Sequence, residues 1–206
     1  MPDEPPTLPD VAAKAGLRAI PYLGGSLAGI YEDFRKRHQA RVDEIVQRIA
    51  DDIGVERLVS RMEEDERIEL LFLNTVTLAS STAYRAKRNL LAKVVRTAVD
   101  DDAKIDQANL MFYALRDLDE PHIRALVRLL HAEDRVRASI PPGEYHEERV
   151  TKAVMEVTQK EPIPVIATLL NVGVADPGTL WGGGHAIARV SEFGRQLLAD
   201  LGEDER

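Results

Sequence analysis

Aliphatic residues recur three and four positions apart through the first two thirds of the chain, and this spacing constrains the fold most strongly. From Ser26 to about residue 136 they form successive amphipathic stretches in which the opposite positions carry charge. A period near 3.6 residues places the apolar side chains on one face of a helix. We therefore expect an all-α protein in which several helices, joined by short connections, pack as a helical bundle.

The chain has an aliphatic core and no cysteine chemistry. Of its 206 residues 44% are hydrophobic but only 5% are aromatic, and none is cysteine. This length is sufficient to close a core without disulfides or a metal. The absence of cysteine excludes disulfide scaffolds, thiol nucleophiles, thiolate zinc sites and iron–sulfur clusters.

Net charge and hydropathy argue against binding of nucleic acid over the whole surface and against a membrane-spanning protein. Twenty-seven Lys and Arg against thirty-five Asp and Glu give a formal charge of −8, which opposes binding of anionic polymers or lipids by the whole surface. The N-terminus, MPDEPPTLPD, lacks the basic-then-apolar order of a secretory signal. The longest uncharged stretches are shorter than the roughly 20 apolar residues of a spanning helix. We expect a cytoplasmic protein without a membrane span, and contact of Ile20–Ile30 with a membrane surface stays an open alternative.

The helical part of the sequence contains recognisable starts and stops. A long helix is predicted from Ser26, its cap, to about Ala50, and Asp65 and Asp119 are predicted to cap later helices. The helix that follows Asp65 is apolar around much of its circumference, which predicts a central position in the bundle. The other predicted helices cover residues 55–62, 84–99, 104–118 and 120–131.

The segment Ser139–Gly143, with two prolines and a glycine, is the clearest boundary in the chain. It divides the predicted bundle, residues 10–138, from a module at residues 144–202, with a flexible arm at 1–9 and a disordered tail at 203–206. In the module we expect helices over residues 145–159 and 161–172, two short strands and a last helix over 192–201 capped by Ser191. The strands are expected at Thr179–Trp181 and His185–Val190, around a Gly182–Gly184 turn.

The C-terminal run LNVGVADPGTLWGGGHAIARVSEFGRQLLADL resembles a degenerate winged-helix module. Gly173, the Gly182–Gly184 tip and Ser191–Gly194 followed by Leu197 and Leu198 occupy the places of the turn, the wing and the last helix in such modules. The resemblance implies a winged-helix-like fold with one short β-hairpin. The front of the chain, from IPYLGGSLAGI through RAKRNLLAKVV, is similar to a group of uncharacterised bacterial helical proteins, which implies no activity.

Motifs for catalysis and metal binding are weak or incomplete. Gly24–Gly29 approaches the G-x-S-x-G elbow of hydrolases around Ser26, but Ala28 replaces the last glycine and no buried strand clearly precedes it. The five histidines lack metal-ligand spacing, and the acidic runs Glu63–Glu66 and Asp100–Asp102 suit helix starts. Gly182–Gly184 lacks the lysine of a phosphate-binding loop. We therefore predict no catalytic, cofactor-binding or metal-binding residue.

One helix concentrates positive charge in this acidic chain. Residues 84–96 contain five basic residues and no acid, and Arg85, Arg88, Lys93 and Arg96 fall on one side of the helix. With Arg189 and Arg195 of the C-terminal module they form a candidate surface for an anionic partner. The alternative, which we weigh more heavily, is a solvated face whose charges pair with acidic residues of neighbouring helices.

Two classes of function follow from the sequence. The first is a non-enzymatic interaction or regulatory protein, homo-oligomeric or bound to a protein partner, that acts through apolar helix faces and the C-terminal module. The second is a DNA-binding transcriptional regulator that uses the C-terminal module and the basic side of the helix at residues 84–99, which we call the basic stripe. The helix at Pro162–Val172, which would enter a DNA groove, contains no Lys or Arg, and this favours the first class. A hydrolase built around Ser26, or around His and Glu side chains that meet in space, is a third hypothesis.

Overall fold

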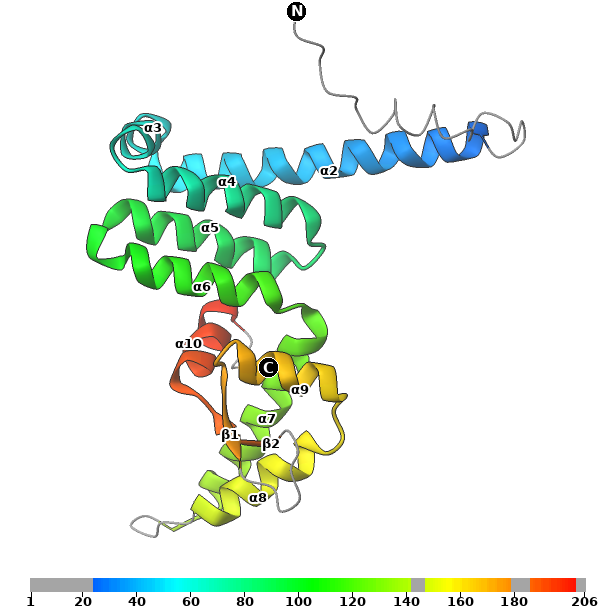
Figure 1. Ribbon diagram of the computed structural model, residues 1–206, viewed down its shortest axis with the longest axis vertical. Coiled ribbons are helices and arrows are strands. Elements are labelled where there is room, and N and C mark those ends of the chain that lie inside the picture. Colours follow the sequence, from blue (N-terminus) through cyan, green and yellow to red (C-terminus); the bar gives the residue numbers. More distant parts are fainter. Residues whose placement is uncertain (1–23, 142–146, 179–185, 203–206) are drawn as a thin grey trace, which may run out of the picture.

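The computed structural model describes residues 24–141, 147–178 and 186–202, with side chains from Lys36 onward, and most of these residues are helical (Figure 1). The predicted arm at 1–9, the tail at 203–206 and the Gly182–Gly184 turn lie outside the described residues. The described elements are α2 (Gly24–Ile53), α3 (Val55–Glu64), α4 (Glu66–Ser81), α5 (Arg85–Asp100), the 3-10 helix η2 (Asp102–Lys104), α6 (Ile105–Asp117), α7 (Glu120–Ala138), α8 (Glu147–Thr158), α9 (Ile163–Asn171), β1 (Ala175–Gly178), β2 (Ala186–Val190) and α10 (Glu192–Leu201).

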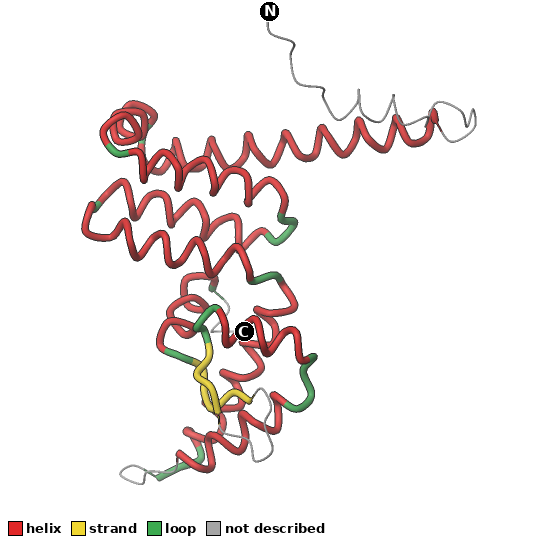
Figure 2. The backbone as a smooth tube through the Cα atoms, viewed as in Figure 1, coloured by secondary structure: helices red, strands yellow, loops and turns green. Residues whose placement is uncertain are grey.

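Helices α2 to α6 form a bundle, and α5 lies at its centre. Helices α2, α4 and α6 all pack against α5, and α3 covers one end of α4 (Figures 1 and 2). The apolar residues of α5 from Leu90 to Val99 are almost completely buried. The prediction that the helix after Asp65 is central is wrong, because α4 leaves Leu70 and Leu73 each 51% exposed. Helix α4 therefore has an apolar outer side as well as an apolar inner side.

The predicted caps determine where several helices begin. The Asp65 carboxylate accepts a hydrogen bond from the backbone N–H of Arg67 at 2.9 Å, and Ser191 Oγ accepts one from Gly194 at 3.0 Å. Asp119 and His122 form a reciprocal capping box at the start of α7. The cap expected at Ser26 is not observed, since α2 already includes Gly24. Gly54 joins α2 to α3 with φ of 87°, a conformation that favours glycine.

The last third of the chain packs around α7. Helices α8, α9 and α10 and strand β2 all contact α7, which extends seven residues beyond its predicted end at His131. Strands β1 and β2 form an antiparallel hairpin with an irregularity between Asp176 and Pro177. The second strand confirms the prediction. The strand that pairs with it covers Ala175–Gly178, ahead of the predicted Thr179–Trp181, which lies outside the described residues. The Asp-Pro-Gly sequence is typical of turns, so tertiary pairing with β2 overrides a local preference here.

Gly194 allows α10 to approach the segment before β1. A Cβ atom at this position would lie 2.1 Å from the backbone oxygen of Val174, so no larger residue fits without a shift of backbone. The Ser191 hydroxyl also donates a hydrogen bond to the Gly173 oxygen at 2.7 Å. The start of α10 is therefore fixed against the end of α9.

A buried carboxylate joins the hairpin and α10 to α7. The Glu133 side chain is 1% exposed and lies within 2.7 Å of guanidinium nitrogens of both Arg137 and Arg195. Its second oxygen accepts a hydrogen bond from the backbone N–H of Val190 in β2 at 3.2 Å. A charge this deeply buried is stable only when it is paired and hydrogen-bonded. Glu133 thus requires α7, β2 and α10 to keep their relative positions.

We expect Glu133→Gln to lower the free energy of unfolding by about 2–3 kcal/mol, because the amide cannot accept all the hydrogen bonds of the carboxylate. Urea denaturation followed by circular dichroism measures this change. Asp134→Asn is the matched control: this neighbour is 53% exposed and contacts Arg195 at 3.5 Å, so its effect should stay below about 1 kcal/mol. Equal losses for both variants would contradict the role assigned to Glu133.

Candidate interaction surface

The cations of the predicted basic stripe are mostly engaged by acidic groups of the same molecule. Arg88 lies 3.5 Å from Glu44 and also donates hydrogen bonds to the backbone oxygens of Thr82 and Ala83. Lys93 pairs with Asp200 of α10, and Arg96 lies 3.4 Å from Asp100 on its own helix. This arrangement corresponds to the solvated, internally paired face that the sequence analysis weighed against an anion-binding surface.

The two cations of the C-terminal module are paired in the same way. Arg189 Nε lies 2.6 Å from Asp176 across the hairpin, and Arg195 binds the buried Glu133. Arg85 is exposed, and no ion pair described for residues 36–202 involves it. The stripe therefore offers Arg85 as its least engaged cation.

Lys87, which the stripe did not include, is buried. Its residue is 1% exposed, and its ammonium group donates hydrogen bonds to the backbone oxygen of Leu118 at 2.7 Å and to Asp119 at 3.1 Å. It thus binds the carbonyl end of α6, where a cation is favoured, and the cap of α7. Lys87 lies four residues before the apolar Leu91 and therefore on the same face of α5. This spacing is the sequence signal that could have predicted its burial.

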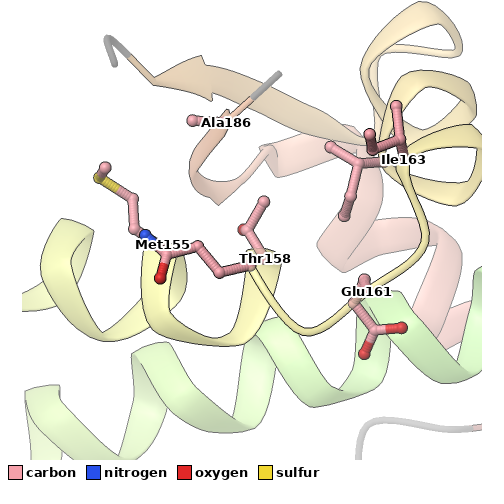
Figure 3. Close-up of a pocket in the computed structure, with 7 residues that line it drawn as sticks. Met155, Thr158, Glu161, Ile163 and Ala186 are labelled. Atoms are coloured by element: carbon pink, nitrogen blue, oxygen red, sulfur yellow. The ribbon is translucent and has the colours of Figure 1, made fainter. Parts of the chain in front are cut away.

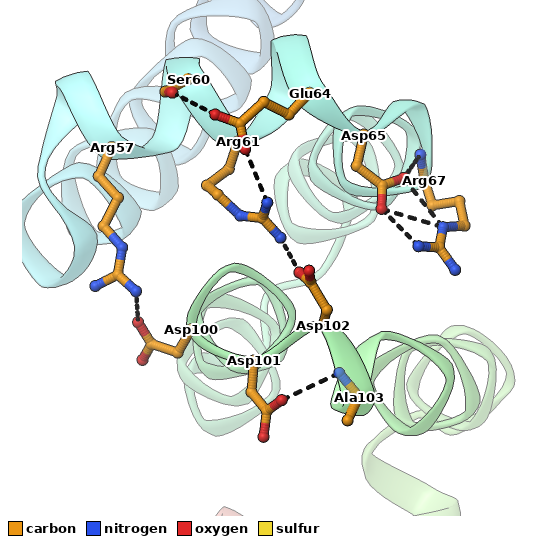
Figure 4. Close-up of polar contacts among 10 residues, drawn as sticks. All are labelled: Arg57, Ser60, Arg61, Glu64, Asp65, Arg67, Asp100, Asp101, Asp102 and Ala103. Carbon is orange, nitrogen blue, oxygen red and sulfur yellow. Dashed lines mark hydrogen bonds and ion pairs between the residues drawn. The ribbon is translucent and has the colours of Figure 1, made fainter.

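The two acidic runs come together at one end of the bundle, next to three arginines (Figure 4). Arg57 lies 3.1 Å from Asp100, and Arg61 bridges Glu64 and Asp102. Hydrogen bonds from Ser60 and Arg61 lower the pKa of Glu64, and those from Arg67 lower the pKa of Asp65. Carboxylates held as anions in this way are poor general acids, so the cluster suits attachment of α3 better than acid–base chemistry.

Two of the described histidines take part in contacts with a neighbouring helix and a cap. His38 contacts Ser80 Oγ at 3.0 Å, and His122 Nδ1 accepts the backbone N–H of Asp119. His146 and His185 lie outside the described residues. Ser26 lies in the first turn of α2, in a segment whose side chains are not described. Among described residues no group of three His, Asp or Glu side chains is placed to hold a metal ion.

Two hollows of the described surface are lined largely by apolar side chains. Figure 3 shows a pocket of about 120 Å³ where Met155 and Thr158 of α8 face Ile163 of α9 and Ala186 of β2. Its one carboxylate, Glu161, is bound by Arg128 at 2.6 Å. A wider groove of about 320 Å³ runs between Leu110 and Tyr113 of α6 and the turn after α9, next to Phe193. Neither hollow brings together the pair of titratable groups that catalysis needs.

Exposed apolar side chains concentrate on the bundle. Six of the seven large ones among the described residues form three pairs spaced by one helical turn, on α3, α4 and α6, and the seventh is Ile163 of α9. The exposed fraction of the paired side chains ranges from 43% to 64%. Helix α4 contacts both α3 and α6. The pairs are Val55 and Val59, Leu70 and Leu73, and Leu110 and Tyr113.

The outer side of α4 lacks charge beyond its first turn. Its exposed positions after Glu69 are Leu70, Leu73, Asn74, Thr77 and Ser81, none of them ionisable, in a chain of which 30% is charged. We call these five residues the α4 face. Exposed large apolar side chains on a surface with few charges are typical of the centre of protein interfaces. The apolar residues all around α4 predict complete burial, so periodicity alone does not reveal this exposed face.

Comparison with known proteins gives no further guide to the site. No model of a known protein family, no curated protein and no solved structure matches the chain. None of the described helices has the length and apolar character required to cross a membrane. The candidate site therefore depends on the geometry alone.

The lowered pKa of Asp65 gives a test at acid pH. A carboxylate whose pKa is lower in the folded than in the unfolded state stabilises the fold above its unfolded pKa, and this contribution is lost as pH falls through the folded pKa. Asn is also a good helix cap, so Asp65→Asn removes mainly the charge. We expect the variant to be less stable than the unmodified chain at pH 6, with a difference that shrinks below about pH 4. Urea denaturation across this range measures it, and a constant difference would contradict the assignment.

Proposed function

We propose that this protein is a non-enzymatic interaction or regulatory protein that self-associates through the α4 face and the neighbouring apolar pairs. The observation that carries the proposal is the exposure of Leu70 and Leu73 on a side of α4 that has no charge beyond its first turn. Burial of apolar surface gains roughly 25 cal/mol per Å², so half-exposed leucines in a patch provide a driving force for association. Single scattered leucines would not support the same argument.

Helices α7 to α10 and the β1–β2 hairpin, which we call the C-terminal unit, are proposed to have a winged-helix-like fold. We propose that this unit binds another protein. The order of its elements supports this: α7, α8 and α9 precede the β1–β2 hairpin, and α10 follows it. The third helix, α9, contains no Lys or Arg and exposes Ile163 by 73%. Such a surface fits an apolar protein contact better than the phosphates of a DNA groove.

DNA binding is the second candidate, and the ion pairs weigh against it. Release of counterions from DNA requires cations free to bind phosphate. Arg88, Lys93 and Arg96 each have a carboxylate partner, as do Arg189 and Arg195. A phosphate would have to displace these partners one by one.

Self-association is tested by size-exclusion chromatography with light scattering over a range of protein concentrations. The unmodified chain should show a mass that is a multiple of 22.9 kDa. Leu73→Asp should shift the mass to that of one chain, because an interface would have to bury the new carboxylate. The matched control is Ile163→Asp, an equally drastic change at an exposed residue of α9, which should leave the mass unchanged. A single-chain mass for the unmodified protein would refute the proposal.

DNA binding is tested by fluorescence anisotropy of a labelled 30-base-pair duplex at 50 mM and 200 mM salt. We expect no saturable binding at either concentration, because the stripe cations are paired. Binding that weakens steeply with salt would instead favour the regulator. Arg85→Ala would then be compared with Arg124→Ala, an exposed arginine of α7 that lies outside the stripe.

A further inference from the structure

Where α2 packs against α5, two arginines share one carboxylate. Arg48 of α2 and Arg88 of α5 lie 3.6 Å and 3.5 Å from the carboxylate of Glu44, which is also on α2. Arg48 donates a further hydrogen bond to Asn89 of α5. These contacts identify the sides of α2 and α5 that face each other.

The preceding turn of each helix adds another arginine to this side. Helices α2 and α5 run in the same direction (Figure 1), and His38 of α2 contacts Ser80 at the end of α4 at 3.0 Å. The start of α5 therefore lies beside this part of α2. Arg41 and Arg85 each precede by three residues the member of the inter-helix ion pair on their own helix. Residues three apart on a helix are neighbours on one face, so both arginines belong to the facing sides.

Together these residues hold more positive than negative charge. We call them the arginine cluster, and its members are Arg41, Glu44, Arg48, Arg85 and Arg88. Four guanidinium groups thus surround one carboxylate, on a chain whose net charge is −8. Helix α5 supplies no further carboxylate here, because no Asp or Glu occurs between Leu70 and Val99.

The cations of the arginine cluster are incompletely satisfied by the described residues. The Arg88 side chain is 13% exposed, and its buried Nε donates no hydrogen bond to any residue that the structure describes. Arg41 Nε donates to the backbone oxygen of Arg37 at 3.2 Å, and no ion pair within residues 36–202 as described involves Arg41 or Arg85. Partly buried cations without enough counter-charge favour the binding of an anion.

We infer that the arginine cluster binds a compact anion that carries phosphate groups, such as pyrophosphate. Guanidinium groups are planar, permanently charged donors that match pairs of phosphate oxygens. Arg41 and Arg48 are seven residues apart, about 10 Å along α2, which suits a compact anion. Duplex DNA distributes its phosphates along its whole length and needs a longer row of free cations. The inference does not depend on self-association through the α4 face.

Isothermal titration of inorganic pyrophosphate into the full chain at low salt tests the site. We expect saturable binding with a Kd of about 10–100 μM. Arg41→Ala and Arg85→Ala should each raise the Kd about tenfold, because each removes charged hydrogen bonds to phosphate. Arg57→Ala is the matched control: it changes the net charge equally, but Arg57 pairs with Asp100 at the other end of the bundle. Its Kd should stay within about twofold of the original value.

Glu44→Gln distinguishes anion binding from a purely structural role of the arginine cluster. The amide leaves Arg48 and Arg88 without their carboxylate, so pyrophosphate should bind about threefold more tightly or better. A cluster that only holds α2 against α5 would lose thermal stability and gain no affinity. Thermal unfolding followed by circular dichroism checks that each variant is folded, and a folded Glu44→Gln variant with weaker binding would overturn the inference.

A second arm distinguishes a soluble anion from a lipid headgroup of the same chemistry. It uses sedimentation with phosphatidylcholine vesicles that either contain or lack phosphatidylinositol bisphosphate. Pyrophosphate binding without sedimentation supports a soluble ligand, and pyrophosphate binding with sedimentation only in the presence of the phosphoinositide supports a headgroup. Absence of saturable pyrophosphate binding, or an equal loss of affinity in Arg57→Ala and Arg85→Ala, would refute the site.

Discussion

Two buried charges fix how α7 connects the bundle to the C-terminal unit, and the rest of the architecture depends on them. Lys87 of α5 binds the carbonyl of Leu118, directly after α6, and the cap of α7, so it sets the direction in which the chain leaves the bundle. Glu133, near the other end of α7, binds β2 and α10. A buried charge without its partners is very costly, so each site tolerates few alternative positions of the elements around it. Apolar packing alone, which is not directional, would allow these helices to slide more freely.

The sequence predicts most helices because their signals are local. Asp65, Asp119 and Ser191 cap helices where they are expected, since a cap needs only its own side chain and the next few backbone N–H groups. The position of β1 could not be predicted in this way, because an Asp-Pro-Gly strand forms only by pairing with β2, where Pro177 lies opposite Ile187, ten positions further on. The burial of Glu133, beyond the predicted end of α7, is likewise a property of the assembled unit.

The candidate site also depends on contacts between residues that are far apart in the sequence. Periodicity identifies the basic residues of α5 as one side of a helix, but it says nothing of the carboxylates opposite them. Lys93 meets Asp200, 107 residues away, and Arg88 meets Glu44 on another helix. For α4 the periodicity predicts more burial than the structure has. Its sequence is apolar on nearly all sides, and only the packing shows that α2, α3, α5 and α6 cover one side and leave Leu70 and Leu73 in solvent.

The position of the α4 face has a consequence for the size of any assembly. When the same face of each copy binds the other, both faces are consumed and association stops at two chains, whereas contact between different faces can continue into a filament. The Ile163 surface of α9 lies in the C-terminal unit and is not part of the α4 face, so pairing through α4 would leave it accessible in both copies. A dimer of this kind would present two copies of the docking surface at once, and a partner with two binding segments would be held far more tightly than one with a single segment.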